Sequence, residues 1–339
     1  MRGCLLALLV LLLSGCGEQL HKQQSYVFGT LVEITLYDQD AARAQRVANQ
    51  VLKDFDAMHQ SLHAWQPGAL ERINGGIALA KPDAPAKASL PPELGPILQD
   101  AARLSEQSEG LFNPAIGNLV RLWGFHSDAF APRLPAAQEI DRLVKAQPSM
   151  RDLHFDGDTL SVANPAVRLD LGGYAKGYAL DQAAAYMKRE GVDNALINIG
   201  GNILALGKKG GQAWKVGIQH PRRAGALAML ELHDGEAIGT SGDYQRYFEL
   251  DGKRYCHLID PRTGWPARQA QAVTVIVHGK HAGTLSDVAS KPLFIAGPSD
   301  WRRLAARMGV SEALFIGAEG QIETTPGMAA RLTWSAAPK

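Results

Sequence analysis

Apolar residues recur along the chain with two different periods, which predicts a mixture of strands and helices. From Tyr26 to Tyr37 the side chains alternate and include several β-branched residues, so this segment predicts a strand. Asp40 then fits a helix N-cap, and apolar residues recur at helical spacing from Val47 onward. We therefore expect a helix that ends near His59, and a chain that begins β-then-α.

The remaining segments continue this mixed pattern. Helices are predicted over residues 93–108, 136–146, 176–190 and 299–308, and strands over 194–206, 214–219, 229–232, 272–278 and 313–316. Residues 78–92, rich in alanine and proline, predict a surface loop. Short turns such as Asp251-Gly252 separate the later strands, which favours antiparallel hairpins over βαβ units. We expect one α+β catalytic unit with a mainly antiparallel sheet over residues 26–335.

The N-terminal segment predicts export. Arg2 precedes the apolar run Leu5–Leu13, which is typical of a signal sequence and too short for a permanent membrane span. The ending Leu-Ser-Gly-Cys resembles the bacterial lipoprotein processing site, which predicts removal of residues 1–15 and acylation of Cys16; the alternative is an ordinary cleaved signal. Residues 16–25 would then form a lipidated tether. The protein would face the periplasm from the inner or the outer membrane.

Composition narrows the classes of function. The chain has 339 residues, of which 46% are hydrophobic, so it has enough apolar material for a core. Lys and Arg number 35 against 34 Asp and Glu, with no basic run, so a nucleic-acid-binding protein is not expected. Once the predicted signal is removed and Cys16 is acylated, only Cys256 remains of the three cysteines, which excludes an intrachain disulfide.

Five segments carry glycine and polar residues for which packing gives no obvious reason. They are residues 61–74, 110–125, 169–181, 237–264 and 284–294. No GxGxxG motif follows a predicted strand, and Gly172-Gly173-Tyr174-Ala175-Lys176-Gly177 is not a P-loop. The sequence therefore argues against a Rossmann or P-loop enzyme.

Taken together, these segments resemble the ApbE family of flavin transferases. The most specific motifs are KGYALD (176–181), TSGDY (240–244) and HLIDPRTG (257–264), and the resemblance runs from about residue 26 to 332. It implies a T-fold-like α+β domain and an enzyme that moves FMN from FAD onto a threonine or serine of a target protein. The implied FAD contacts are Trp65, Phe112, Asn113, Asp170, Lys176, Thr240, Ser241, Gly242 and Leu258.

Several of these residues also have an ordinary structural interpretation. Trp65 stands where the family has a flavin-stacking tyrosine, and it keeps a flat ring, but it could be a core tryptophan. The pair Gly172-Gly173 would let phosphate approach the backbone, or could form a plain strand-to-helix turn. Lys176 could be a solvated lysine. The hydroxyls and the free amide of residues 240–242 suit pyrophosphate oxygens, but this tripeptide could also form a turn. Asn113 replaces an aspartate that is common in the family.

His257 is the predicted catalytic base. An acceptor hydroxyl is a poor nucleophile until a base takes its proton, and histidine suits that task near neutral pH. The resemblance places the transfer histidine at this position, ahead of Asp260-Pro261-Arg262-Thr263-Gly264. The alternative is a structural histidine that is hydrogen-bonded to the turn.

A Mg²⁺ site is implied by the resemblance, with one departure from the family pattern. The family uses a backbone carbonyl matching Gly173 and an aspartate matching Asp287, at an expected helix start. Lys291 stands where the family has a threonine ligand, and a charged ammonium cannot coordinate a cation. Either Ser290 or Thr284 substitutes, or Lys291 itself supplies positive charge to the pyrophosphate.

Three functions remain compatible with these residues. The first is FAD:protein FMN transfer, with acceptors of the Rnf, Nqr or nitrous-oxide reductase type as the resemblance implies. The second is an FAD pyrophosphatase, in which water replaces the acceptor hydroxyl. The third is a non-catalytic periplasmic flavin-binding lipoprotein, which would leave His257 unexplained.

Overall fold

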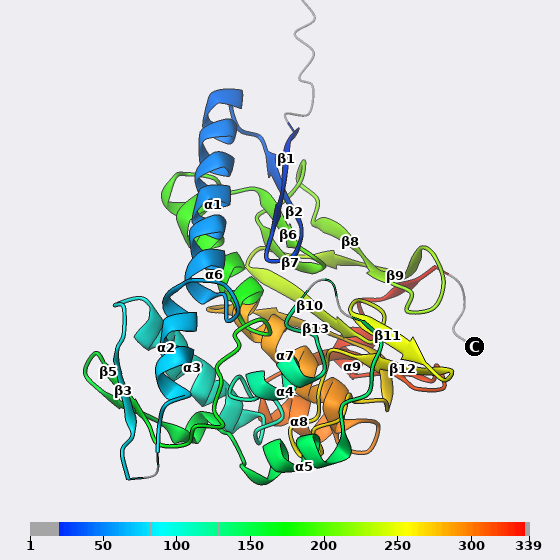
Figure 1. Ribbon diagram of the computed structural model, residues 1–339. Helices are drawn as coiled ribbons and strands as arrows, with labels where there is room; N and C mark the ends of the chain where they lie inside the picture. The colour runs from blue at the N-terminus through cyan, green and yellow to red at the C-terminus, as the bar shows by residue number, and fades with distance from the viewer. Residues whose placement is uncertain (1–19, 82, 128, 130, 336–339) are drawn as a thin grey trace, which may run out of the picture.

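An eight-stranded sheet forms the centre of the molecule. The computed structural model describes residues 20–335 except 82, 128 and 130, and within it every neighbouring pair of strands in this sheet is antiparallel (Figure 1). The order is β1-β2-β6-β7-β10-β13-β14-β15. The bounds are Leu20–Val27, Thr30–Tyr37, Ala195–Ile199, Asn202–Leu206, Glu236–Gly242, Ala270–His278, Glu312–Gly317 and Ile322–Thr324, in that order. The expected α+β class with a mainly antiparallel sheet is confirmed.

Two segments that predicted single strands are tight hairpins. Phe28 and Gly29 have φ values of 56° and 69°, so the chain reverses between β1 and β2. Gly200 and Gly201, at φ 58° and 93°, reverse it between β6 and β7. Because β1 begins at Leu20, residues 20–25 belong to the sheet, and the expectation of a tether over residues 16–25 is wrong for these six residues. The polar side chains of β1 follow from its place at the sheet edge.

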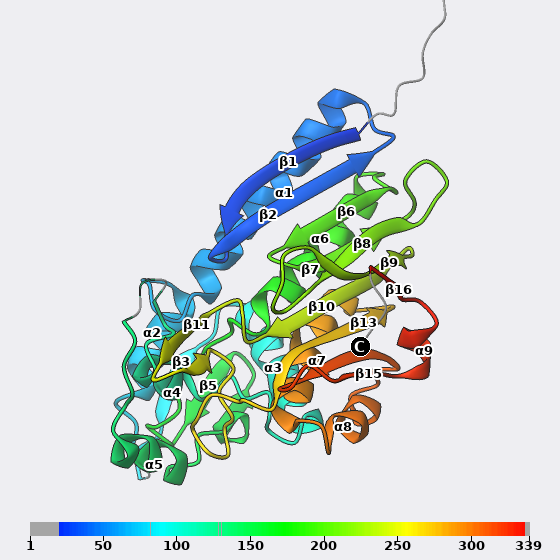
Figure 2. The same cartoon turned by 90° about the vertical axis from the view of Figure 1, so that its right-hand side faces the viewer.

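Three helices cover one face of the sheet (Figure 2). They are α1 (Ala41–Leu62), α6 (Ala175–Arg189) and α7 (Ala282–Ala296). The side chain of Asp40 accepts a hydrogen bond from the Arg43 amide, which confirms the predicted N-cap of α1. Pro292 lies inside α7, where it removes one backbone donor. The expectation that Asp287 lies at a helix start is wrong, because the helix begins at Ala282 and Asp287 lies within it.

The other face of the sheet packs on a smaller, three-stranded sheet of order β16-β9-β8. The bounds are Thr333–Trp334, Ala226–Leu232 and Trp214–Gln219. Residues of β13 alternate between the two cores, with Val273 and Val275 toward the helices and Ala272 and Ile276 toward the small sheet. β13 is therefore buried on both faces, which explains its nearly continuous apolar sequence.

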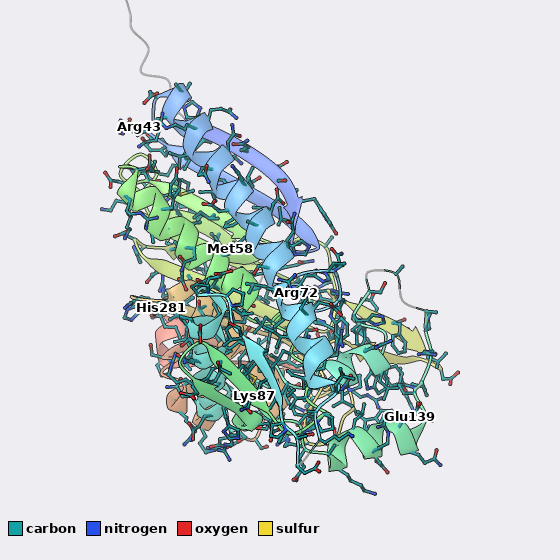
Figure 3. The ribbon with its side chains drawn as sticks, turned by 60° about the vertical axis from the view of Figure 1, so that its left-hand side comes forward. Arg43, Met58, Arg72, Lys87, Glu139 and His281 are labelled. Atoms are coloured by element: carbon teal, nitrogen blue, oxygen red, sulfur yellow. The ribbon has the colours of Figure 1, made fainter. Side chains whose placement is uncertain are left out.

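A mostly helical region lies beyond one end of the sheet (Figures 1 and 3). It contains α2 (Ala69–Ile77), α3 (Leu94–Gln107), α4 (Gly117–Leu122), α5 (Ala137–Lys145), a 3₁₀ turn (Met150–Asp152), and the strands β3 (Ala86–Ser89), β4 (Leu153–Asp156) and β5 (Thr159–Val162). The hairpin β11 (Tyr247–Leu250) and β12 (Lys253–Cys256) packs on α4 and α5. β3 lies inside the predicted loop 78–92. Figure 3 shows Met58 on α1, Arg72 on α2 and Lys87 on β3.

The C-terminal part adds α8 (Trp301–Arg307) and α9 (Pro326–Ala329) beside α7 and β14. Within the described residues, no helix has the length and apolar character needed to cross a membrane. The predicted signal segment and Cys16 lie outside the described residues. Cys256 is a buried free thiol, and burial raises its pKa to about 12.

Candidate functional site

The site begins where α7 crosses α6 and β10 at very short range. A Cβ atom at Gly177 of α6 would stand 2.3 Å from the carbonyl oxygen of Gly283, and one at Gly239 of β10 would stand 2.3 Å from that of Ser286. Only glycine permits both approaches. Asp181 fixes the start of α7, because its carboxylate accepts hydrogen bonds from the Gly283 amide (2.8 Å) and from the Thr284 amide and hydroxyl. This packing brings Asp287 next to the first turn of α6.

Lys176, Asp287 and Lys291 form a compact charged group, here called the lysine cluster. Lys291 Nζ donates to Asp287 Oδ1 (2.5 Å) and to the Asp287 carbonyl oxygen (2.6 Å), while Lys176 Nζ lies 3.9 Å from the same Oδ1. The Gly177 amide donates to Asp287 Oδ2 (2.9 Å). Burial raises the pKa of Asp287, but the two ammonium groups outweigh it and hold that pKa below its usual value. Asp287 is 1% exposed and remains a carboxylate at neutral pH.

Hydroxyl groups of β10 continue the site along the sheet. Ser241 Oγ and Ser290 Oγ are 2.8 Å apart, and Thr240 Oγ1 lies 2.9 Å from Thr274 Oγ1. Ser290 also donates to the Asp287 carbonyl (3.0 Å). Thr240, Ser241 and Gly242 lie in β10 and pair with β13, so the alternative of a turn is wrong. A Cβ at Gly242 would collide with the ring of Tyr244, so glycine is required there for packing.

The turn before α6 joins the cluster to an aromatic side chain. Asp170 accepts hydrogen bonds from the Gly172 amide (2.8 Å) and from Trp65 Nε1 (3.1 Å). Lys176 Nζ donates to the Gly172 carbonyl (3.3 Å). A Cβ at Gly173 would meet the Lys291 side chain at 3.0 Å and the Phe112 ring at 3.5 Å. The structure thus brings Phe112, Asp170, Gly173, Lys176 and Lys291 to one place.

Trp65 is only partly buried, and one face of its ring is covered by an arginine that lies outside the predicted site residues. The guanidinium carbon of Arg168 lies 4.4 Å from the Trp65 ring centroid, and Arg168 Nη2 donates to the Ala64 carbonyl (3.1 Å). Arg168 Nε is buried and has no hydrogen-bond partner in the described part of the chain. No local motif marks this residue, because Trp65 and Arg168 meet only through tertiary packing.

His257 follows β12 and is oriented by the backbone. Its Nδ1 lies 3.2 Å from the Arg246 carbonyl oxygen. A carbonyl only accepts, so Nδ1 carries the proton and Nε2 keeps its lone pair. Desolvation, followed by the positive charge of Arg246, lowers the pKa of His257 to about 3, and Lys291 and Lys176 add to this effect. His257 is therefore a neutral base within electrostatic range of the lysine cluster.

The segment after His257 is a rigid turn. Asp260 accepts hydrogen bonds from the Arg262 amide (2.9 Å) and pairs with the Arg262 guanidinium (2.8 Å). Its carbonyl accepts from the Thr263 and Gly264 amides. The Gly264 carbonyl in turn accepts from Trp123 Nε1 (2.8 Å). The DPRTG motif therefore holds the histidine-bearing segment against the α4–α5 region.

Two of the predicted FAD contacts take part in hydrogen bonds that hold the backbone in place. Asn113 donates to the Pro148 carbonyl (2.9 Å) and accepts from the Ala115 amide (3.0 Å), so its amide group is engaged. Leu258 is buried, and its carbonyl accepts from the Ala267 amide (2.8 Å). Their contact with FAD stays a prediction.

The contacts of the lysine cluster do not fit a Mg²⁺ ion. Both carboxylate oxygens of Asp287 already accept hydrogen bonds, one of them from the Lys291 ammonium. Thr284 is engaged with Asp181, and Ser290 with Ser241, so neither hydroxyl stands free as a substitute ligand. Among residues 20–335 as described, no group of three or more His, Cys, Asp or Glu side chains is arranged to hold a metal.

A second cationic feature lies near Trp65, at α4 and α5. It is a cavity of about 780 Å³, lined by Arg121, Arg133, Arg142 and the imidazole of His126, and is here called the arginine cavity. The His126 ring lies 5.3 Å from that of Trp65, centroid to centroid. Burial, then the charges of Arg121 and Arg168, lower the pKa of His126.

Comparison with known proteins agrees with this arrangement. Residues 28–315 match the ApbE family. The chain is 41% identical over 307 residues to an FAD:protein FMN transferase of Rhodobacter capsulatus, covering 91% of this chain but 57% of that protein. It is 31% identical to an FAD:protein FMN transferase of Vibrio cholerae, covering 86% of each chain.

Solved structures show the same fold. The ApbE protein of Thermotoga maritima superposes with a TM-score of 0.82 at 30% identity, covering 92% of this chain and 99% of that one. The flavinyl transferase ApbE of Pseudomonas stutzeri gives 0.79 at 29% identity, covering 94% and 98%. The fold, the motifs and the family match agree, and the chain belongs to the ApbE family.

Proposed function

We propose that this protein is an FAD:protein FMN transferase. The observation that carries the proposal is the position of His257, a neutral imidazole whose Nε2 keeps its lone pair, within electrostatic range of two partly buried ammonium groups. A base next to a cationic site is what attack of a hydroxyl on a pyrophosphate requires. The names of the Rhodobacter and Vibrio relatives support the same activity.

The reaction follows from these groups. The hydroxyl oxygen of an acceptor threonine or serine attacks the phosphorus on the FMN side of the FAD pyrophosphate. His257 Nε2 takes the hydroxyl proton as the new phosphorus–oxygen bond forms. The bond from that phosphorus to the bridging oxygen breaks, and AMP leaves with the electron pair. Lys176 and Lys291 supply the positive charge that the pyrophosphate oxygens need.

The flavin end of FAD is assigned to Trp65. One face of this ring is covered by Arg168, and the indole N–H is held by Asp170, so the ring has a fixed orientation. A fixed aromatic surface binds a flat ring with little loss of side-chain freedom. Stacking at Trp65 and phosphate binding at the lysine cluster would place the two ends of FMN on either side of Gly172.

We also propose where the enzyme works. The signal-like N-terminus supports an exported lipoprotein, acylated at Cys16 and facing the periplasm. Acceptors there would be flavin-bearing subunits of membrane electron-transfer complexes, of the Rnf, Nqr or nitrous-oxide reductase type. Metabolic labelling with a fatty-acid analogue, compared between wild type and Cys16→Ser, tests the lipid anchor.

The activity is tested with the full chain in detergent, FAD and a candidate acceptor subunit. The expected result is an FMN mass increment on the acceptor, with an equal amount of AMP released. FMN and AMP released in equal amounts without labelling would identify a pyrophosphatase. FAD bound but unchanged would identify a carrier, and either result would overturn the transferase.

A further inference from the structure

We infer that the ammonium group of Lys291 takes the place of a divalent cation in this site, so that FMN transfer here proceeds without Mg²⁺. The inference takes FAD as the substrate from the proposed function. The replacement of the cation is argued from the contacts of the Lys291 side chain. Lys291 Nζ lies 2.5 Å from Asp287 Oδ1 and 2.6 Å from the Asp287 carbonyl oxygen. A positive charge therefore already occupies the one carboxylate that a cation would need.

The surroundings of Lys291 keep its side chain in this position. Only 15% of the side chain is exposed, and a Cβ at Gly173 would stand 3.0 Å from its Cδ and Cε, so the chain fits because residue 173 is a glycine. Its ammonium donates to both the carboxylate and the carbonyl oxygen of Asp287, and that carbonyl also accepts from Ser290 Oγ.

The charge balance opposes a divalent cation at the same place. Lys176 Nζ lies 3.9 Å from Asp287 Oδ1, so two ammonium groups share one carboxylate oxygen. An added Mg²⁺ at Oδ1 would stand against both of them in a buried site, where repulsion is poorly screened. Without it, two cations and one carboxylate leave a net positive charge within electrostatic range of His257, which is the sign that a pyrophosphate requires.

Lys291 also keeps a donor for the substrate. An ammonium group has three donors, and Asp287 accepts from two of them. The third is available to a phosphate oxygen. Lys291 is thus a substrate-binding group in this proposal, while Asp287 positions it.

The experiment compares the full-length wild type with Lys291→Thr, in Mg²⁺ and in EDTA after removal of metals. The wild type should transfer FMN at rates within about twofold in both buffers. Lys291→Thr should lose at least about tenfold in EDTA and regain activity with Mg²⁺, because an oxygen donor replaces the ammonium. The control Lys188→Thr removes an exposed lysine near the end of α6 and should behave as wild type. A wild type that is inactive in EDTA and restored by Mg²⁺ overturns the inference.

A readout without any acceptor separates this inference from the proposed function. Calorimetric titration with MgCl₂ should give no binding heat for the wild type and a saturable signal for Lys291→Thr. FAD affinity, measured by flavin fluorescence, should be unchanged by EDTA in the wild type. It should fall at least about tenfold in Asp287→Asn/Lys291→Met, which removes both charges and so avoids a lone buried carboxylate. Mg²⁺ binding by the wild type, or FAD affinity equal in all variants, overturns the inference even if no acceptor is ever labelled.

Discussion

The lysine cluster and the arginine cavity are both cationic, but they hold their charge in different ways. In the cluster, Lys176 and Lys291 face one buried carboxylate, whose two oxygens accept from the Lys291 ammonium and the Gly177 amide. In the cavity, no ion pair within the described residues involves Arg121, Arg133 or Arg142. The cluster is organised before any ligand arrives, whereas the cavity leaves its charges open to solvent. Preorganised charge is what a chemical step uses, so we place the reaction at the cluster.

The largest expected effect is at the base beside the cluster. His257→Ala should lower FMN transfer by about 10² to 10⁴, the range for loss of a general base, and leave FAD binding nearly unchanged. The reason is that the imidazole acts on the acceptor proton. Transfer kinetics and fluorescence titration of FAD measure the two quantities. A variant that transfers at the wild-type rate would remove His257 from the mechanism.

The next effect concerns the stability of the cluster itself. Asp287→Asn leaves two ammonium groups without their carboxylate, which should lower the free energy of unfolding by about 3 kcal/mol, near the lower end for a broken buried pair. Urea denaturation followed by tryptophan fluorescence measures it. Asp287→Asn/Lys291→Met, which removes the charge on both sides, should recover part of the loss. An Asp287→Asn protein as stable as the wild type would show that the pairing contributes little.

Replacement of Trp65, the aromatic residue between the two regions, should have an intermediate effect, on FAD affinity. Trp65→Ala should weaken FAD binding by about 1 to 3 kcal/mol, on the scale of base stacking, while Trp65→Tyr should largely preserve it because a flat ring remains. Fluorescence titration of FAD measures all three proteins. Equal FAD affinity in all of them would make Trp65 a packing residue only.

The pH dependence of the wild type should be small. Because the pKa of His257 is lowered to about 3, the imidazole stays a neutral base until the pH falls toward that value. The ratio kcat/KM for FAD reports the free enzyme, so it should change by less than about twofold between about pH 5 and pH 8. A fall in kcat/KM centred near pH 6.5 would mean that burial and the charge of Arg246 do not lower the pKa of His257.

The smallest effect is expected in the cavity. Arg142→Ala removes an arginine that has no ion pair among the described residues, so the free energy of unfolding should change by no more than about 0.5 kcal/mol. Denaturation under the conditions used for Asp287→Asn gives a direct comparison. A loss close to that of Asp287→Asn would erase the distinction between the two regions.

The sequence predicts the fold class and the local motifs better than the contacts between distant segments. The HLIDPRTG turn is local, and its histidine and its Asp260–Arg262 pair can be expected from neighbours in the chain. The helix α7 is not predicted in full, because its serine, threonine and proline residues weaken the helical pattern. With that helix assigned, the four-residue spacing of Asp287 and Lys291 would predict their pairing.

Other parts of the site depend on tertiary structure alone. Arg168 contacts Trp65, which lies more than a hundred residues earlier in the sequence. Asp181 accepts hydrogen bonds at the start of a helix that begins about a hundred residues later, at Ala282. No spacing rule predicts such contacts, and the second of them follows from the glycine-mediated crossing of α6 and α7. The strand β1 escapes prediction for a different reason, because most of its side chains are half-buried or exposed and lack the apolar alternation of a buried strand.

The hairpin of β1 and β2 also determines how the protein would respond to tension at its N-terminus. Leu20 lies at the open end of the hairpin, paired with Tyr37, and the ladder runs from there to Val27. A pull on Leu20 along the strand axis would load these hydrogen bonds in shear, all at the same time, because they run perpendicular to the strands. Peeling, which breaks one bond after another, would need a pull on Leu20 across the strands. A protein held at its N-terminus would therefore resist mechanical detachment of its first strand when the pull runs along that strand.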